Sequence, residues 1–310
     1  MFLFLFTLTR KYIFMRKVLL SAIALFLFFF FVSAQSDFEK LQMEYEKLLN
    51  DPKNIYGRNK ETGKYYDIRG FKMYAEVYGE GQPLLFIHGN GGSISHFTNQ
   101  IPYFAKKYKV IIADSRAQGK SADSKDSLSY EMMADDYAAL LDAMKIDSAY
   151  VVGWSDGGIN GLLMAIRHPE KVKKLATTGA NLRPDSTAVP QIIWDMVIPT
   201  YKELKNKADK NEMEKAGFKM MRLLSEQPHI SHSDLQKIKC PVLVIGGDHD
   251  VIKEEHTLEI YKNISNAYLW ILPNSGHSTP VVYAEEFNKK VDEFFKQPFR
   301  KFDDPSKRFF

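Results

Sequence analysis

Residues 149–165 read AYVVGWSDGGINGLLMA and place a serine in a tight turn between a strand and a helix. The apolar run at residues 150–152 predicts a buried strand, and apolar residues recur at helical spacing from residue 159 on. Between them, residues 153–157 have the form G-x-S-x-G, a turn that holds its serine in a strained conformation and exposes the hydroxyl. An ordinary glycine-rich turn is the alternative, but the flanking strand and helix favour Ser155 as a nucleophile.

Strands and helices alternate along most of the chain, which predicts βαβ units and a parallel sheet. The pair 65–68 and 71–78 predicts a hairpin across Arg69-Gly70, and the second strand alternates as a half-buried strand should. The further expected strands are 83–87, 110–113, 150–152, 172–177, 242–245 and 267–272, and the expected helices of the core are 130–144, 254–263 and 280–296.

The alternation stops between residues 183 and 239, where apolar spacing predicts about three amphipathic helices and no strand. This insertion comes after the strand that follows the nucleophile helix. Helices placed there would lie over the carboxyl edge of the sheet, where binding sites occur in such folds. We expect a helical lid, with an ordinary peripheral helix layer as the alternative.

The first 34 residues have the pattern of an export signal rather than of a folded domain. Arg16 and Lys17 precede an apolar run at residues 18–32, and Ala34 supplies a small residue for cleavage before Gln35. Met15 would be an alternative start, with residues 1–14 as an upstream extension. An uncleaved membrane anchor is the competing interpretation, although the apolar run is short for a span. We expect an exported protein with no stable membrane association after cleavage.

Composition narrows the function classes. Of 310 residues, 45% are hydrophobic and 26% charged, which is enough for a globular core throughout. The net charge of +4 comes with no basic stripe, so nucleic acid is not an expected partner. The single cysteine, Cys240, excludes an intramolecular disulfide and a cysteine metal cluster. The sequence does not indicate an oligomeric state.

Three residues of complementary chemistry stand at strand ends, in the order Ser155, Asp250, His277. Parallel strands bring their carboxyl ends to one edge, so these distant residues can meet there. His277 would then take the serine proton, and the acid would orient the imidazole. Asp248 competes with Asp250 for the orienting role, and a surface histidine is the alternative for His277.

The loop after the expected strand at 83–87, His88-Gly89-Asn90-Gly91-Gly92-Ser93, is rich in glycine. Glycines there let the backbone approach a ligand and present N–H groups to it. The backbone N–H of Asn90, together with that of Asp156, would form an oxyanion hole; a flexible loop is the simpler alternative. We interpret His88 as a structural histidine, and the charges of residues 114–121 as ordering their own loop.

The motifs HGNGGS, DSRAQGKS, GWSDGG, GGDHD and NSGH, each at an expected strand end, resemble those of an α/β-hydrolase of the single-lid esterase type over residues 65–297. The block from residue 151 to 186 is similar to the valacyclovir hydrolase (biphenyl hydrolase-like) group. The resemblance implies Ser155, Asp250 and His277 as the triad. It implies the N–H groups of Asn90 and Asp156 as the oxyanion hole, and the side chain of Asp156 as the partner of a substrate α-amino group.

The expected architecture is therefore α/β: a mostly parallel central sheet with helices on both faces. Its core spans residues 35–182 and 240–297, with a lid at 183–239 and a loose tail at 298–310. The expected activity is hydrolysis of a small carboxylic ester, with α-amino acid esters as candidates and Trp154 as a second substrate-binding residue. A hydrolase of C–C bonds in meta-cleavage products and a non-catalytic ligand-binding homologue are the alternatives. Neither a cofactor nor a metal is expected. The departures from the group are the export signal, the lid sequence and Ala117, where many relatives have glycine.

Overall fold

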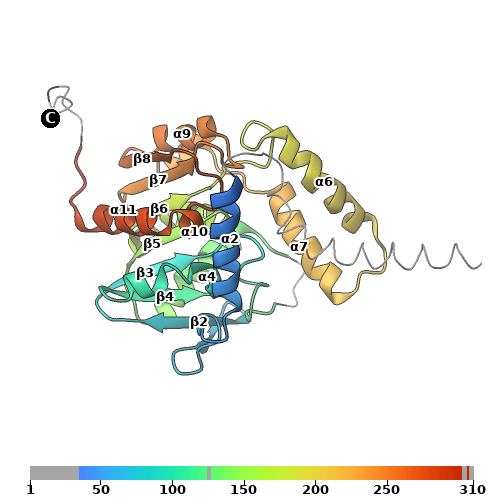
Figure 1. Cartoon of the computed structure of the whole chain (residues 1–310), viewed down its shortest axis with the longest axis horizontal. Helices are drawn as coiled ribbons and strands as arrows, with labels where there is room; N and C mark the ends of the chain where they lie inside the picture. Colours follow the sequence, from blue (N-terminus) through green and yellow to red (C-terminus); the bar gives the residue numbers. More distant parts are fainter. Residues whose placement is uncertain (1–34, 124–126, 302–305, 307–310) are drawn as a thin grey trace, which may run out of the picture. The chain divides into compact units, whose positions relative to one another are not determined.

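The computed structural model describes residues 35–123, 127–301 and 306 (Figure 1). The expected export signal at residues 1–34 lies outside these residues. The chain divides into two units, residues 1–44 and 45–310, and helix α2 (Gln35–Asn50) crosses their boundary. Apolar residues spaced by three and four between Phe38 and Leu48 account for this helix. The remaining description concerns the unit of residues 45–310.

Eight strands form one sheet in the order β1-β2-β4-β3-β5-β6-β7-β8. Strand β2 runs antiparallel to β1 and β4, and the other neighbouring strands are parallel, which confirms a mostly parallel sheet. The strands are β1 (Lys64–Ile68), β2 (Phe71–Tyr78), β3 (Gln82–Ile87), β4 (Tyr108–Ala113), β5 (Ala149–Trp154), β6 (Val172–Thr178), β7 (Val242–Gly247) and β8 (Ala267–Leu272).

The expected hairpin is present, with Ile68 paired to Phe71 across a two-residue turn. The expectation of a half-buried β2 is wrong, because Tyr74 and Glu76 on its second face are buried as well. The loop before β1 supplies the reason: the backbone N–H groups of Gly57 and Asn59 both donate to the Glu76 carboxylate at 2.9 Å. A buried carboxylate is tolerated when donors satisfy it in this way.

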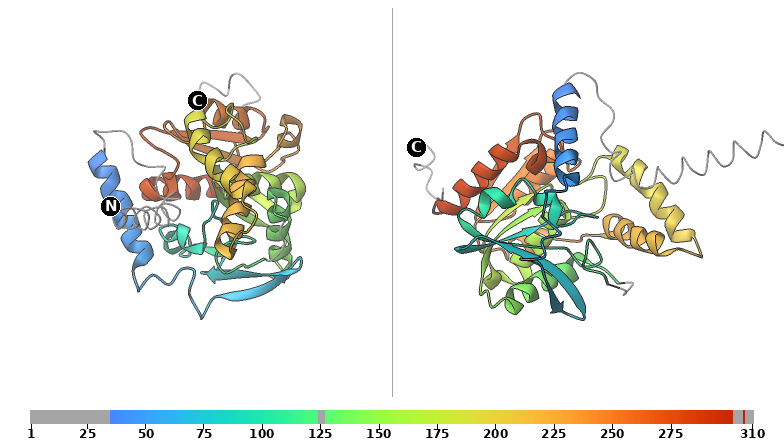
Figure 2. Two further views of the ribbon diagram at one scale, coloured as in Figure 1. Left: turned by 90° about the vertical axis from the view of Figure 1, so that its right-hand side faces the viewer. Right: turned by 60° about the horizontal axis from the view of Figure 1, so that its bottom comes forward.

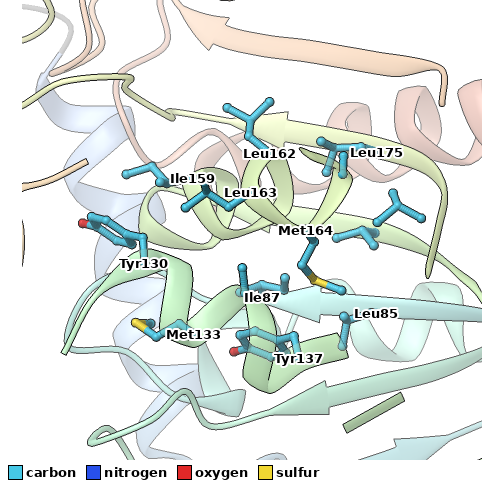
Figure 3. Close-up of a cluster of buried hydrophobic side chains, with 14 of the residues drawn as sticks. Leu85, Ile87, Tyr130, Met133, Tyr137, Ile159, Leu162, Leu163, Met164 and Leu175 are labelled. Carbon is cyan, nitrogen blue, oxygen red and sulfur yellow. The ribbon is translucent and has the colours of Figure 1, made fainter. Parts of the chain in front are cut away.

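Helices cover both faces of the sheet, as expected. One face packs against α4, α5 and α9, and the other against α3 and α11, each through its own apolar cluster. Figure 3 shows the first cluster, in which Tyr137 of α4 and Leu163 of α5 lie over Leu85 and Ile87 of β3. The helices of these layers are α3 (Ile101–Phe104), α4 (Tyr130–Ala143), α5 (Asp156–Arg167), α9 (Glu254–Lys262), α10 (Thr279–Val282) and α11 (Ala284–Lys296), with 3-10 turns η2 (Ile94–Phe97) and η3 (Pro169–Lys171).

Two details of the helices differ from expectation. The single helix expected at 280–296 is two, α10 and α11, because the backbone of Tyr283 (φ −113°, ψ 42°) leaves the helical region between them. Between β3 and β4 the structure has η2 and α3, which the sequence pattern did not predict. Their short lengths leave too few turns for a periodic signal.

The insertion after β6 contains α6 (Gln191–Asn206), α7 (Glu212–Glu226) and the single turn α8 (His232–Leu235). Helices α6 and α7 lie side by side, with the rings of Tyr201 and Phe218 stacked at 6.1 Å (Figure 2). Figure 1 shows both helices beyond the edge at which the parallel strands end. In the part of the chain that the structure describes, no helix is long and apolar enough to cross a membrane.

One carboxylate ties the two ends of the insertion together. Glu259 on α9 accepts two hydrogen bonds of 2.8 Å from Arg183, at the start of the insertion, and one of 2.5 Å from His232, near its end. The bonds from Arg183 hold the pKa of Glu259 at about 2, so the carboxylate is ionised at neutral pH. The insertion is therefore anchored at both ends to the same helix of the core.

Candidate active site

Ser155 occupies the turn between β5 and α5 with φ 59° and ψ −122°, a strained conformation for a residue with a side chain. Its glycine neighbours make the turn possible. A Cβ on Gly153 would lie 2.1 Å from the carbonyl oxygen of Gly157, and a Cβ on Gly157 would lie 1.9 Å from that of Ile87. The N–H of Ser155 donates to Thr178 O at 2.8 Å, which ties the turn to the end of β6.

The structure brings the three strand-end residues together. The ring of His277 contacts Ser155 Oγ through Nε2 at 2.9 Å and Asp250 Oδ1 through Nδ1 at 2.6 Å. Asp250 follows β7, and His277 follows β8. The Asp250 side chain is 1% exposed and accepts a further bond of 3.1 Å from the backbone N–H of Ile252. The backbone N–H of Ile252 therefore helps to hold the Asp250 carboxylate in the orientation in which it contacts the imidazole.

Electrostatics favour a defined tautomer of His277. Burial lowers the pKa of the imidazole, but the carboxylates of Asp250 and Asp156 together outweigh burial, and the pKa is raised overall. With Nδ1–H donating to Asp250, Nε2 keeps its lone pair for the hydroxyl of Ser155. The arrangement can therefore accept the serine proton and stabilise the imidazolium that forms.

Asp248 has a different environment from Asp250. Its carboxylate bonds to its neighbour His249 at 2.8 Å and accepts the backbone N–H of Ser275 at 3.0 Å. Of the two competing carboxylates, Asp250 is the one that contacts His277. Asp248 accepts a hydrogen bond from Ser275, in the loop that carries His277.

The loop after β3 lies directly against the serine. A Cβ on Gly89 would be 3.1 Å from Ser155 Cβ, so a larger residue there would press on the serine. The side chain of Asn90, the next residue, donates from Nδ2 to Asp156 Oδ2 at 2.8 Å. Both residues expected to supply oxyanion N–H groups are thus adjacent and joined through their side chains.

The Asp156 carboxylate is 2% exposed and has two neutral partners. Besides Asn90, the hydroxyl of Tyr130 donates to Asp156 Oδ1 at 2.7 Å. Burial raises the pKa of Asp156 to about 6, against the opposing effects of these hydrogen bonds and of His277. Among the described residues no lysine or arginine forms an ion pair with Asp156.

Trp154, expected as a second substrate-binding residue, contacts the loop that carries His277. Its indole N–H donates to the backbone oxygen of His277 at 2.8 Å, and its ring lies against those of His96 and Phe97. The only polar atom of this side chain is therefore engaged by the histidine loop, which it helps to hold in place.

His88 has the structural role expected of it. The ring is completely buried; Nδ1 contacts Gly89 O at 2.8 Å, and Nε2 accepts the N–H of Ser115 at 2.9 Å. Burial lowers the pKa of His88 to about 4, so the ring is neutral and fixed in one tautomer.

The charges of the loop after β4 order that loop, as expected. Asp114 accepts the backbone N–H groups of Ile94 and Lys120 at 2.8 and 2.7 Å. Arg116 is buried and pairs with Asp136 at 2.6 Å and with Asp123 at 2.7 Å. Ala117 has φ 61°, a left-handed conformation that favours glycine, the residue that the resemblance implies at this position.

Two residues at the site carried no specific sequence signal. Gly179, just after β6, has φ 62°, and a Cβ there would lie 2.7 Å from His277 Cε1. Tyr130 reaches Asp156 from the first turn of α4.

No group of three or more His, Cys, Asp or Glu residues that could hold a metal ion occurs in residues 35–123, 127–301 or 306.

Comparison with known proteins agrees with the fold. Residues 82–229 match the family model described as alpha/beta hydrolase fold. The enol-lactonase from Burkholderia xenovorans LB400 superposes with a TM-score of 0.64 at 21% identity, covering 76% of this chain and all of that one. Together with the sheet order, these matches show that the chain has the α/β-hydrolase fold, and the curated relatives described next show a hydrolase.

Two curated relatives are similar over most of their length. The chain is 25% identical over 246 residues to serine hydrolase BPHL of Homo sapiens, covering 74% of this chain and 84% of that protein. It is 26% identical over 281 residues to 2-hydroxymuconate semialdehyde hydrolase of Pseudomonas sp. (strain CF600), covering 80% and 98%. The first match agrees with the resemblance to the biphenyl hydrolase-like group.

Proposed function

We propose that this hydrolase cleaves small carboxylic esters through an acyl-enzyme intermediate on Ser155. The observation that carries the proposal is the continuous hydrogen-bonded set Ser155, His277 and Asp250, at 2.9 and 2.6 Å, at the carboxyl ends of β5, β8 and β7. A serine hydroxyl is a weak nucleophile unless a base removes its proton, and His277 is placed to do so.

In the proposed reaction, Ser155 Oγ attacks the ester carbonyl while His277 Nε2 takes the hydroxyl proton. The N–H groups of Asn90 and Asp156 donate to the oxyanion. Collapse of the tetrahedral intermediate breaks the bond between the carbonyl carbon and the alcohol oxygen, and the alcohol leaves with the proton from His277. A water molecule then attacks the acyl-serine, gives a proton to His277, and releases the carboxylic acid as the proton returns to Ser155. Asp250 keeps the imidazole in the required tautomer throughout.

We further propose that α-amino acid esters are preferred. Asp156 is a buried carboxylate beside the nucleophile whose partners in the described structure are two neutral donors. An ionised group is costly to bury without a cation, so a substrate ammonium next to the scissile carbonyl would offset that cost. The resemblance to the valacyclovir hydrolase group supports the same role.

The test compares α-amino acid esters with their desamino analogues in the wild type and in Asp156→Asn, which removes the charge and keeps an acceptor. A charge-assisted contact of about 1.5–3 kcal/mol predicts about one to two decades in kcat/KM in favour of the amino ester. The variant should lose this preference and still hydrolyse the desamino ester. Equal wild-type rates for both esters would reject the amine as a determinant of substrate choice.

A second candidate is hydrolysis of a C–C bond, since a relative covering 80% of the chain is named as 2-hydroxymuconate semialdehyde hydrolase. The same serine and histidine would serve that reaction. Assaying 2-hydroxymuconate semialdehyde beside a panel of p-nitrophenyl esters separates the two. We expect the higher kcat/KM on the esters; the reverse order would favour the second candidate. The non-catalytic alternative has no support from the two curated relatives named above, both of which are named as hydrolases.

We also propose that residues 183–239 act as a lid and that the chain is exported. The lid is supported by Gln227, at the end of α7, which accepts the backbone N–H of Tyr130, the residue whose hydroxyl contacts Asp156. Export is supported by Arg16-Lys17, the apolar run at 18–32 and Ala34. N-terminal sequencing of the mature protein should find Gln35 first; retention of residues 18–32 would indicate an anchor instead.

A further inference from the structure

The two residues proposed to donate to the oxyanion come from different elements. Asn90 lies in the loop after β3, and Asp156 is the first residue of α5. Their side chains are bonded directly to each other, Asn90 Nδ2 to Asp156 Oδ2 at 2.8 Å. The same two residues therefore contribute the backbone groups of the proposed oxyanion hole and a side-chain link across it.

The link ends on a rigid support. Tyr130 is fully buried, and its hydroxyl holds the second oxygen of the same carboxylate at 2.7 Å. Tyr130 begins α4 behind the N-cap Ser129, and its backbone N–H donates to Gln227 Oε1 at 3.2 Å. Both oxygens of Asp156 are thus occupied, and the carboxylate has a single orientation set by α4 and α5.

The loop on the other side of the link needs such support. Asn90 stands among Gly89, Gly91 and Gly92, and glycine restricts the backbone least of all residues. Gly91 has φ 65°, and a Cβ there would meet nothing within 4 Å, so side-chain packing does not fix this part of the loop. The loop has one backbone bond of its own across Asn90, from Gly92 N–H to Gly89 O at 3.1 Å, and the side chain of Asn90 adds the bond to α5.

We propose that the Asn90–Asp156 side-chain bond is a positioning device that sets the spacing of the two oxyanion donors, with Tyr130 orienting the carboxylate. The proposal rests on the proposed ester hydrolysis and applies to every ester, with or without an amino group. Oxyanion donors act in proportion to their fit to the transition state, because the ground-state carbonyl oxygen occupies a different position. Loss of the bond therefore lowers kcat more than it raises KM.

The primary test is Asn90→Ala, which removes the side-chain bond and keeps the backbone N–H. Removal of a complete oxyanion donor costs about 10²–10³ in kcat, so displacement of one donor should cost less, about 5- to 30-fold on a neutral p-nitrophenyl ester. KM should change less than threefold. The matched control is Asn266→Ala, because Asn266 also donates one side-chain bond, of 2.8 Å to Lys239 O, and lies away from the site.

Variants of Asp156 supply the second arm. Asp156→Asn keeps an acceptor for Asn90 Nδ2, so it should lose less kcat on the neutral ester than Asp156→Ala does. Asp156→Ala should lose about as much kcat as Asn90→Ala. The double variant Asn90→Ala/Asp156→Ala should be no slower than the slower single variant, since both remove one bond. Tyr130→Phe should give a smaller loss of kcat, with Tyr137→Phe on the same helix, bonded to Ser115 Oγ at 2.7 Å, as its control.

The outcomes separate this inference from the proposed function. A wild-type kcat in Asn90→Ala would overturn the positioning role. So would a loss of kcat in the double variant equal to the product of the losses in the two single variants. Either result would leave the proposed ester hydrolysis intact. Undiminished hydrolysis in Ser155→Ala would instead reject the proposed function. If Asn90→Ala unfolds in a thermal melt, the ratio of Asp156→Asn to Asp156→Ala decides: rescue by asparagine supports the inference, and equal losses reject it.

Discussion

At the scale of single residues, the environment rather than the residue type separates Asp250 from Asp248. The Asp250 side chain is 1% exposed and bonded to the imidazole, whereas that of Asp248 is 34% exposed and bonded to an exposed neighbour and a backbone N–H. Both positions follow β7 in the same short motif, so the sequence left both open. The turn after the strand decides which carboxylate faces inward.

This difference predicts unequal effects of the same substitution. Asp250→Asn should lower kcat by about 10⁴, because an amide favours the wrong tautomer of His277. Asp248→Asn should cost less than about tenfold, since an amide oxygen still accepts the backbone N–H of Ser275. Steady-state kinetics on one p-nitrophenyl ester measure both, with folding checked by circular dichroism. A larger loss in Asp248→Asn would reverse the assignment.

The environment of His277 also predicts the pH dependence of turnover. The imidazole must be neutral to accept the serine proton, so kcat/KM should rise as pH increases through its pKa. Burial lowers this pKa, and Asp250 and Asp156 together raise it by more, so the midpoint should lie above the ordinary value of 6.5. In Asp250→Asn the raising effect of Asp250 is lost and burial remains, which should move the midpoint of the residual activity below that of the wild type. An unchanged midpoint would show that Asp250 does not control the titration.

At the scale of elements, the site depends on how closely the end of β6 approaches the histidine loop. Gly179 follows this strand, and its missing side chain leaves the space that the ring of His277 occupies. The strand itself was predictable from its apolar run. The close approach was not, because it depends on how the loops after β6 and β8 lie in space.

Gly179→Ala should therefore reduce kcat strongly, by about tenfold or more, because a Cβ would lie 2.7 Å from His277 Cε1 and 2.9 Å from Nδ1. Gly57→Ala is the control: Gly57 has φ 85°, so the backbone strain is similar, but the nearest atom to a Cβ is 3.6 Å away. Both variants should lose some thermal stability, about 1 kcal/mol. Equal kcat values in the two variants would show that the space beside His277 is not needed.

At the scale of the whole molecule, local patterns predicted most of the architecture. Alternating apolar strands and helices indicated the parallel sheet, and the order of strand ends indicated that Ser155, Asp250 and His277 would meet, because parallel strands share one carboxyl edge. What could not be predicted depends on contacts between elements. The Tyr130–Asp156 bond requires α4 to pack against α5, and the burial of Glu76 requires the loop before β1 to fold over β2.

The central claim is that Ser155 carries the acyl group, and covalent labelling tests it most directly. The full chain is treated with a fluorophosphonate, which reacts with activated serines, and its peptides are analysed by mass spectrometry while esterase activity is followed. We predict one label per chain, on the peptide containing Ser155, with activity lost in proportion to labelling. Ser155→Ala should be unlabelled, with kcat reduced by about 10⁴ or more. A label on another residue that accompanies the loss of activity, or a Ser155→Ala variant that still turns over esters, would contradict the account.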